Sequence, residues 1–145
     1  MIAVAEKRLE IELPASLKAF YHEYGYGFLD SLYENVNRIM DPLSITDYIR
    51  KTGDYEQYPN VKDFSFDGHM IPFFEVNLGI IFFIELNTSD SQKIYYADVV
   101  IAESFQEFLD KYTEDEFYYT DLKTAAVSKS ETATEEDLWT IGSIS

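Results

Sequence analysis

The sequence contains no cysteine among its 145 residues. This absence excludes disulfides, thiolate nucleophiles and thiolate-ligated metal sites together. Long hydrophobic runs are also missing, since the longest, Ile80 to Ile84, is far too short to cross a bilayer. The segment from Met1 to Arg8 has no long apolar stretch after a basic start, so we expect no signal peptide. These absences predict a soluble, cytoplasmic protein.

Motifs for catalysis and metal binding are lacking as well. The two histidines, His22 and His69, have no partner histidine or cysteine at the spacing of metal ligands. Neither a nucleophile elbow, a phosphate-binding loop nor a dinucleotide-binding glycine motif is present. We therefore expect no metal, no cofactor and no catalytic residue. A hydrolase stays an alternative only through unassigned carboxylate pairs, and it requires an apolar pocket that holds two acids.

Basic residues are few, with 11 lysines and arginines against 27 aspartates and glutamates, which gives a net charge of −16. A field of this sign repels nucleic acid and anionic membranes, so we expect neither as a partner. It attracts a basic protein and accelerates that encounter. The alternative is that the charge serves solubility alone.

Three segments carry helical patterns. Residues 4–10 are predicted to end a short helix, and Pro14 is expected at the first position of the next, which stops at Gly25. Capping boxes are expected to begin two later helices, at Ser44 and at Ser104. Apolar stripes at i, i+3, i+4 and i+7 mark two of these helices, namely Leu17, Phe20, Tyr21 and Tyr24, and Phe105, Phe108, Leu109 and Tyr112.

The middle of the chain has the pattern of a sheet. Asp67-Gly68 predicts a hairpin turn between strands at 64–66 and 70–76. Residues 80–86 predict a central strand buried on both faces, and 93–97 predict the return strand. Residues 28–40 are expected to form a long loop or an irregular element. The result is an α+β fold in which helices flank an antiparallel β-meander. We expect a single domain over 1–118 and a C-terminal extension, a short helix or docking tail, over 119–145.

An ordered set of segments resembles the SUKH superfamily, which includes the yeast cell-wall-synthesis regulator and many bacterial immunity proteins. The resemblance covers about residues 4–112 and rests on pieces that are individually weak but occur in the expected order. They are Glu6 to Glu10, Leu13-Pro14, the aromatic helix ending at Gly25, Ser44 to Thr52, Ile71-Pro72-Phe73, Ile80 to Leu86, and Ala102 to Phe105 with Phe108-Leu109. The turn at Tyr24 to Gly27 departs from the Asn-Gly-Gly-like turn of many members.

The resemblance implies a binding domain and not an enzyme. Many bacterial members are immunity proteins that neutralise a co-encoded toxin, often a nuclease, by direct binding. An acidic inhibitor that covers the basic groove of a nuclease matches the charge of this chain. The alternative implied by the eukaryotic members is a regulatory or scaffold domain with no toxin partner.

Composition and expected exposure indicate a partner-binding surface of acidic and aromatic residues. The candidates are Tyr26, Asp30, Tyr33, Glu34, Asp54, Tyr55, Glu56, Glu114, Asp115, Glu116, Phe117 and Tyr118. The alternative for the aromatic members near residue 117 is that their rings pack beneath the C-terminal extension. That extension, anchored by Trp139, either folds back on its own domain or exchanges between protomers to form a homodimer.

Overall fold

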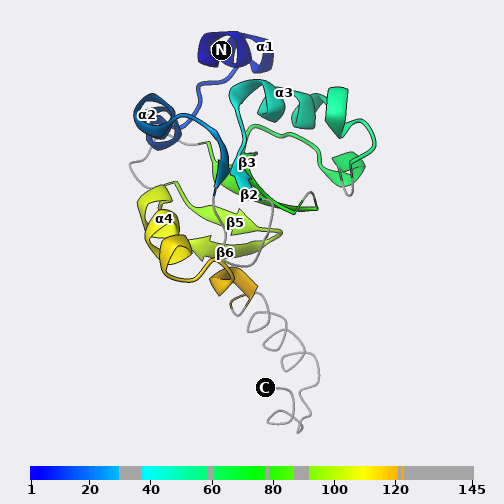
Figure 1. Cartoon of the computed structure of the whole chain (residues 1–145). Helices are drawn as coiled ribbons and strands as arrows, with labels where there is room; N and C mark the ends of the chain where they lie inside the picture. Colours follow the sequence, from blue (N-terminus) through cyan, green and yellow to red (C-terminus); the bar gives the residue numbers. More distant parts are fainter. Residues whose placement is uncertain (30–36, 59–60, 78, 87–91, 121, 123–145) are drawn as a thin grey trace, which may run out of the picture.

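A six-stranded antiparallel sheet forms the centre of the protein, and its strand order follows the chain from β1 to β6 (Figure 1). The computed structural model describes residues 1–29, 37–58, 61–77, 79–86, 92–120 and 122. The strands are β1 Gly27–Leu29, β2 Asn37–Ile39, β3 Met70–Val76, β4 Ile80–Glu85, β5 Ile94–Tyr96 and β6 Val99–Ala102. The predicted α+β meander is confirmed.

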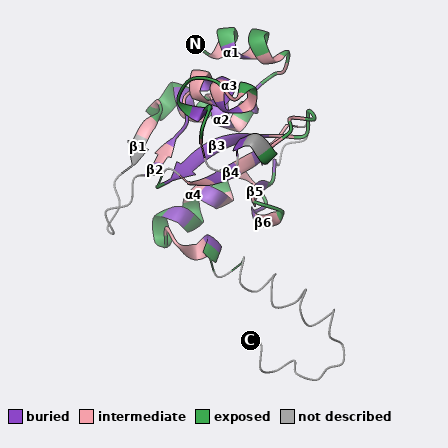
Figure 2. Cartoon of the chain, turned by 90° about the vertical axis from the view of Figure 1, so that its right-hand side faces the viewer, coloured by how far each residue is buried: buried purple, intermediate pink, exposed green. Residues whose placement is uncertain are grey.

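The described residues form four α-helices, of which α3 and α4 cover opposite faces of the sheet and α1 packs on α3 (Figure 2). The helices are α1 Ile2–Leu9, α2 Ala15–Tyr24, α3 Pro42–Arg50 and α4 Phe105–Glu114. Phe82 on β4 contacts the ring of Phe108 on α4, whereas the next residue, Phe83, contacts the ring of Tyr48 on α3. Because successive side chains of a strand point to opposite faces, α3 and α4 lie on opposite sides of the sheet.

The helix α4 follows its sequence signals closely. The Ser104 hydroxyl accepts a hydrogen bond from the Glu107 amide at 3.1 Å, so the predicted cap is confirmed. The Glu107 carboxylate accepts in return from the amide of Glu103 at 2.8 Å, one residue before the cap. The buried side of the helix presents Phe105, Phe108 and Tyr112 to the sheet, as the apolar stripe predicts.

The two N-terminal helices lie in the predicted segments, but α2 differs from the prediction at both of its ends. Pro14 has an extended backbone and is the cap residue before α2, not its first helical residue. Gly25 ends the helix with φ 80° and ψ −152°, a conformation open to glycine rather than the expected left-handed helical one. The Phe20 ring packs edge-on against Phe105, which joins α2 to α4.

The predicted cap of α3 at Ser44 is wrong. The helix begins at Pro42, and the Asp41 carboxylate accepts from the Ser44 amide at 2.6 Å. Proline at the first helical position and aspartate before it are a stronger start than Ser44, because proline needs no hydrogen-bond acceptor there. Two 3₁₀ turns follow, η1 Gly53–Tyr55 and η2 Val61–Asp63.

The expected hairpin at Asp67-Gly68 is also wrong, because residues 64–67 form no strand and β3 begins only at Met70. The Asp67 carboxylate instead accepts from the amide of His69 at 2.9 Å, which makes a local turn that leads into β3. The segment 28–40, expected to be a loop, contains β2 and most of β1. These three-residue strands are stabilised by their neighbours in the sheet and carry little local signal.

Packing of the core continues beyond α4. The Tyr119 ring is buried against Phe82 and Tyr96, and the Tyr118 hydroxyl donates to the Ile101 carbonyl at 2.8 Å. The packed body therefore extends at least to Tyr119, one residue past the boundary expected at 118. The expected helix and dimer contact of the C-terminal extension lie outside the described residues.

Candidate functional site

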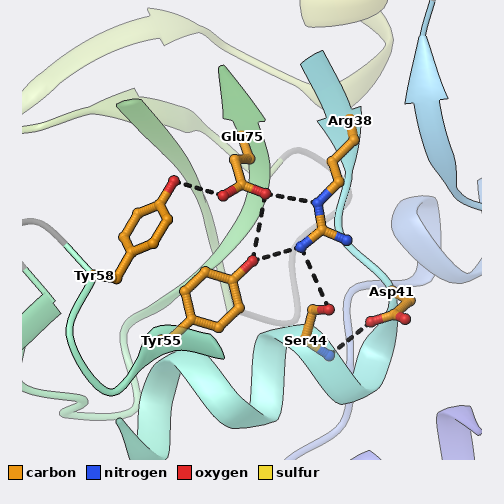
Figure 3. Close-up of polar contacts among 6 residues, drawn as sticks. All are labelled: Arg38, Asp41, Ser44, Tyr55, Tyr58 and Glu75. Carbon is orange, nitrogen blue, oxygen red and sulfur yellow. Dashed lines mark hydrogen bonds and ion pairs between the residues drawn. The ribbon is translucent and has the colours of Figure 1, made fainter. Parts of the chain in front are cut away.

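A buried ion pair joins two neighbouring strands on the α3 side of the sheet (Figure 3). Arg38 on β2 and Glu75 on β3 are directly opposite each other in the register. The Arg38 Nε donates to Glu75 Oε1 at 2.6 Å, and the Glu75 side chain is only 2% exposed. A carboxylate placed this deep requires partners, because an uncompensated buried charge is strongly destabilising.

Two tyrosines complete the hydrogen bonding of this carboxylate. The Tyr58 hydroxyl donates to Glu75 Oε2 at 2.5 Å, and the Tyr55 hydroxyl lies 3.4 Å from Oε1 (Figure 3). Arg38 Nη2 donates to the Tyr55 hydroxyl at 2.5 Å and lies 3.5 Å from the Ser44 hydroxyl on α3. We call these five side chains the Arg38–Glu75 network. It fixes η1 and the segment after it against the sheet.

The electrostatics of the network keep its tyrosines protonated. Burial, helped by the charge of Glu75, raises the pKa of Tyr55 to about 12. Burial and the hydrogen bond to Glu75 raise the pKa of Tyr58 still further. Burial lowers the pKa of Arg38, but the hydrogen bonds and charge interactions with Glu75 and Tyr55 together outweigh it, so the net shift of this pKa is upward. The network therefore holds one positive and one negative charge and acts as a rigid support.

This support presents two of the predicted partner-binding residues at the surface. Asp54 and Glu56 are exposed on either side of Tyr55. Tyr55 itself is 3% exposed and its hydroxyl belongs to the Arg38–Glu75 network, so it leaves the set of surface candidates. The prediction for Asp54 and Glu56 stays a prediction, and η1 gives it a defined place on the α3 side of the sheet.

A second group of predicted residues lies at the end of α4, on the other side of the sheet. Glu114 and Asp115 are exposed, while Glu116, Phe117 and Tyr118 are half-buried. The Asn37 amide nitrogen on β2 donates to the Tyr112 hydroxyl at 2.7 Å and lies 3.4 Å from Glu116 Oε1. This group and the η1 group therefore occupy different faces of the molecule.

Of the remaining candidates, Tyr26 lies within the described residues. Tyr26 is 48% exposed just before β1, and its ring contacts the edge of Tyr21. Next to it, Tyr24 at the end of α2 is the most exposed large hydrophobic residue described. Asp30, Tyr33 and Glu34 lie outside the described residues.

A cavity of about 480 Å³, which the sequence did not predict, lies beside the network. It is bounded by Tyr48 from α3, by Asp63 at the end of η2, by the next residue, Phe64, and by β4. The sequence gives no sign of it, because residues 64–66 have the pattern of a strand. Its described lining contains one carboxylate and not the acid pair that a hydrolase needs.

The described residues contain no group of three or more histidine or acidic side chains arranged to hold a metal ion. Within the same residues, none of the helices has the length and apolar character needed to cross a membrane.

The fold and the surface described above are those of a small α+β domain that presents acidic and aromatic side chains around a rigid sheet. The model of the SMI1 / KNR4 family (SUKH-1) matches residues 1–111, and the chain belongs to this family. The resemblance found in the sequence is thereby confirmed.

A curated relative is similar over most of its length. The immunity protein YxxD of Bacillus subtilis (strain 168) is 41% identical over 122 residues, which cover 83% of this chain and 83% of the relative. No solved structure matches the chain.

Proposed function

We propose that this chain is an immunity protein that neutralises a toxin by binding it directly, without chemistry of its own. The observation that carries the proposal is the 41% identity to the immunity protein YxxD over 83% of both chains. Membership of the SMI1 / KNR4 family supports the same role. The proposal places the protein in the cytoplasm, where an incoming or newly made toxin acts.

The charge of the chain supports a basic partner. A net charge of −16 over 145 residues attracts a positively charged surface and raises the association rate at low ionic strength. A nuclease domain carries such a surface where it binds the phosphate backbone. We therefore propose a basic toxin domain, in particular a nuclease, which the inhibitor blocks by occupying the substrate groove.

The proposed contact residues follow from the exposed acidic groups. The backbone that carries Asp54 and Glu56 is fixed by the hydrogen bonds of Tyr55 between them, so little backbone entropy is lost when a partner binds these residues. We further propose that the binding domain extends through the packed Tyr119 and that residues 120–145 form a separate extension. Light scattering after size exclusion, on the chain intact and truncated after residue 120, distinguishes an extension that folds back from one that links two protomers.

Co-expression with the product of the neighbouring gene tests the function. A toxin domain expressed alone should arrest growth of the host, and co-expression of this chain should restore growth and give a complex that survives size exclusion. A charge-reversed chain with Asp54→Lys and Glu56→Lys should rescue less well while keeping its fold. Absence of a toxic neighbour and of any complex would contradict the proposal and favour the regulatory or scaffold role.

A further inference from the structure

The cavity beside the Arg38–Glu75 network is a groove of aromatic rings with one carboxylate at its edge. The rings of Phe64 and Phe83 stack with centroids 5.2 Å apart, and the Tyr48 ring meets Phe64 edge-on at 5.6 Å. Ile81 and Ala97 continue the lining, and Asp63 supplies the carboxylate. We call this cavity the ring–carboxylate groove.

The groove exists because the sheet is covered incompletely on the α3 side. Helix α3 and the two 3₁₀ turns pack over β2, β3 and the near edge of β4, as the contacts of Tyr48 with Phe83 and of Tyr55 with Glu75 show. Phe64 and Phe83 remain only half-buried. The opposite side of β4 is closed, since Phe82 is fully buried beneath α4. The face of β4 on the α3 side is therefore accessible to a binding partner.

The charges of the groove select a cation. Its described lining includes one acidic residue, the exposed Asp63, and neither lysine nor arginine. Asp98, which is exposed, follows Ala97 in the turn between β5 and β6. The chain as a whole carries −16, so this end of the sheet lies in a negative field. Aromatic faces beside a carboxylate attract a cation through both the ring quadrupole and the charge.

We propose that the ring–carboxylate groove receives an arginine side chain of a basic protein partner. The planar guanidinium stacks on an aromatic face and forms paired hydrogen bonds with a carboxylate, which an ammonium does not do. A volume of about 480 Å³ accommodates such a side chain together with part of its backbone. The inference rests on the proposed function, because it names the contact through which that partner is anchored.

The first test needs no knowledge of the partner. The full chain, labelled with nitrogen-15, is titrated with N-acetyl-arginine methylamide while the backbone amides of Phe64, Gly79 and Ala97 are followed by NMR. We expect saturable shifts at these amides with a Kd of about 1 mM, the affinity typical of a ligand of this size. The blocked lysine analogue should bind more weakly, and the blocked norleucine analogue more weakly still.

Matched variants locate the charge. Asp63→Asn should weaken arginine binding about tenfold, because it removes a charge-assisted hydrogen bond. Asp63→Glu should restore most of the affinity. Asp110→Asn changes the net charge equally but lies exposed on α4, across the sheet, so it should leave the affinity within about twofold. Equal binding of norleucine, or equal effects of the two asparagine variants, would overturn the inference.

The second test separates this inference from the proposed function. With the purified toxin domain, Asp63→Asn should raise the Kd about tenfold, mainly through faster dissociation. Tight toxin binding that ignores Asp63 would refute the groove while leaving the function intact. Failure of the wild-type chain to bind the toxin would contradict the function, and the arginine titration would still decide the groove. Shifts at the groove amides that follow protein concentration instead would identify a second copy as the occupant.

Discussion

Replacement of Arg38 by methionine tests whether the buried ion pair supports the fold. The substitution keeps most of the apolar stem and removes the guanidinium that neutralises Glu75. Breaking a fully buried pair costs about 3–5 kcal/mol. Arg38 is 21% exposed and Glu75 retains the hydroxyl of Tyr58, so we expect a smaller loss of unfolding free energy, about 2–3 kcal/mol.

Urea unfolding followed by far-ultraviolet circular dichroism measures this loss. Lys18→Met is the matched control, because Lys18 has a similar exposure of 25% but pairs with Glu6, which is 23% exposed, whereas the partner of Arg38 is buried. Because such part-exposed pairs contribute little, this control should cost less than about 1 kcal/mol. Glu75→Gln closes a double-mutant cycle with Arg38→Met, and we expect a coupling energy above about 1 kcal/mol.

The result that would refute the reasoning is an equal cost of Arg38→Met and Lys18→Met. That outcome would mean that water replaces the guanidinium beside Glu75, and that η1 is held by its tyrosine packing alone. A coupling energy near zero would lead to the same conclusion, because two residues that act as a unit cannot be additive.

Three further outcomes follow from the structure. Burial and the charge of Glu75 raise the pKa of Tyr48 and of Tyr55 to about 12, so the unfolded chain loses these protons first. The free energy of unfolding should be constant below about pH 10 and should fall by about 1.4 kcal/mol per pH unit for each tyrosine up to about pH 12. Tyrosinate absorbance of the folded protein should show that these tyrosines titrate above about pH 10. A single titration midpoint near about pH 10 in the folded protein would contradict this. Phe108→Ala should cost about 3–5 kcal/mol in urea unfolding, since Phe108 is fully buried among the rings of the sheet. Ser104→Ala should cost about 1 kcal/mol by removing the cap of α4, and Ser104→Asp should restore it; no loss in the alanine variant would show that the cap is replaced by water.

The sequence predicted those elements whose signals lie within one turn or one strand. Ser104 makes the contact expected of a helix cap, whereas Glu107, three residues later, accepts from the amide of Glu103 and not from that of the cap residue. Met70–Val76 has the predicted bounds, because an apolar run interrupted only by Glu75 lies between turn residues. The elements that failed depend on partners far along the chain. β2 is three residues long and gains its stability from β3, which begins some thirty residues later.

The candidate site was less predictable than the fold. Glu75 interrupts an apolar strand, and a lone carboxylate there signals a buried partner. That signal does not identify the partner, since Arg38, Tyr55 and Tyr58 are brought to it by three different segments. The sequence could not predict the groove, because the groove depends on the ring of Phe64, which stacks on Phe83 of β4 although Phe64 is not part of a strand. Turn residues such as Asp67-Gly68 indicate that the chain changes direction but not that the flanking segments pair.

The chain-order arrangement of the sheet has a kinetic consequence. Every strand pairs with its neighbour in the sequence, and β3 to β6 are joined by short connections. The long connection is the one between β2 and β3, residues 40–69, which must bring its two ends together before these strands pair. Folding rates rise as contacts become more local, so the β3–β6 portion can form early and as the chain leaves the ribosome. For the immunity role proposed above, this strand order would let the chain bind a partner synthesised at the same moment, because little time separates its synthesis from its folded state.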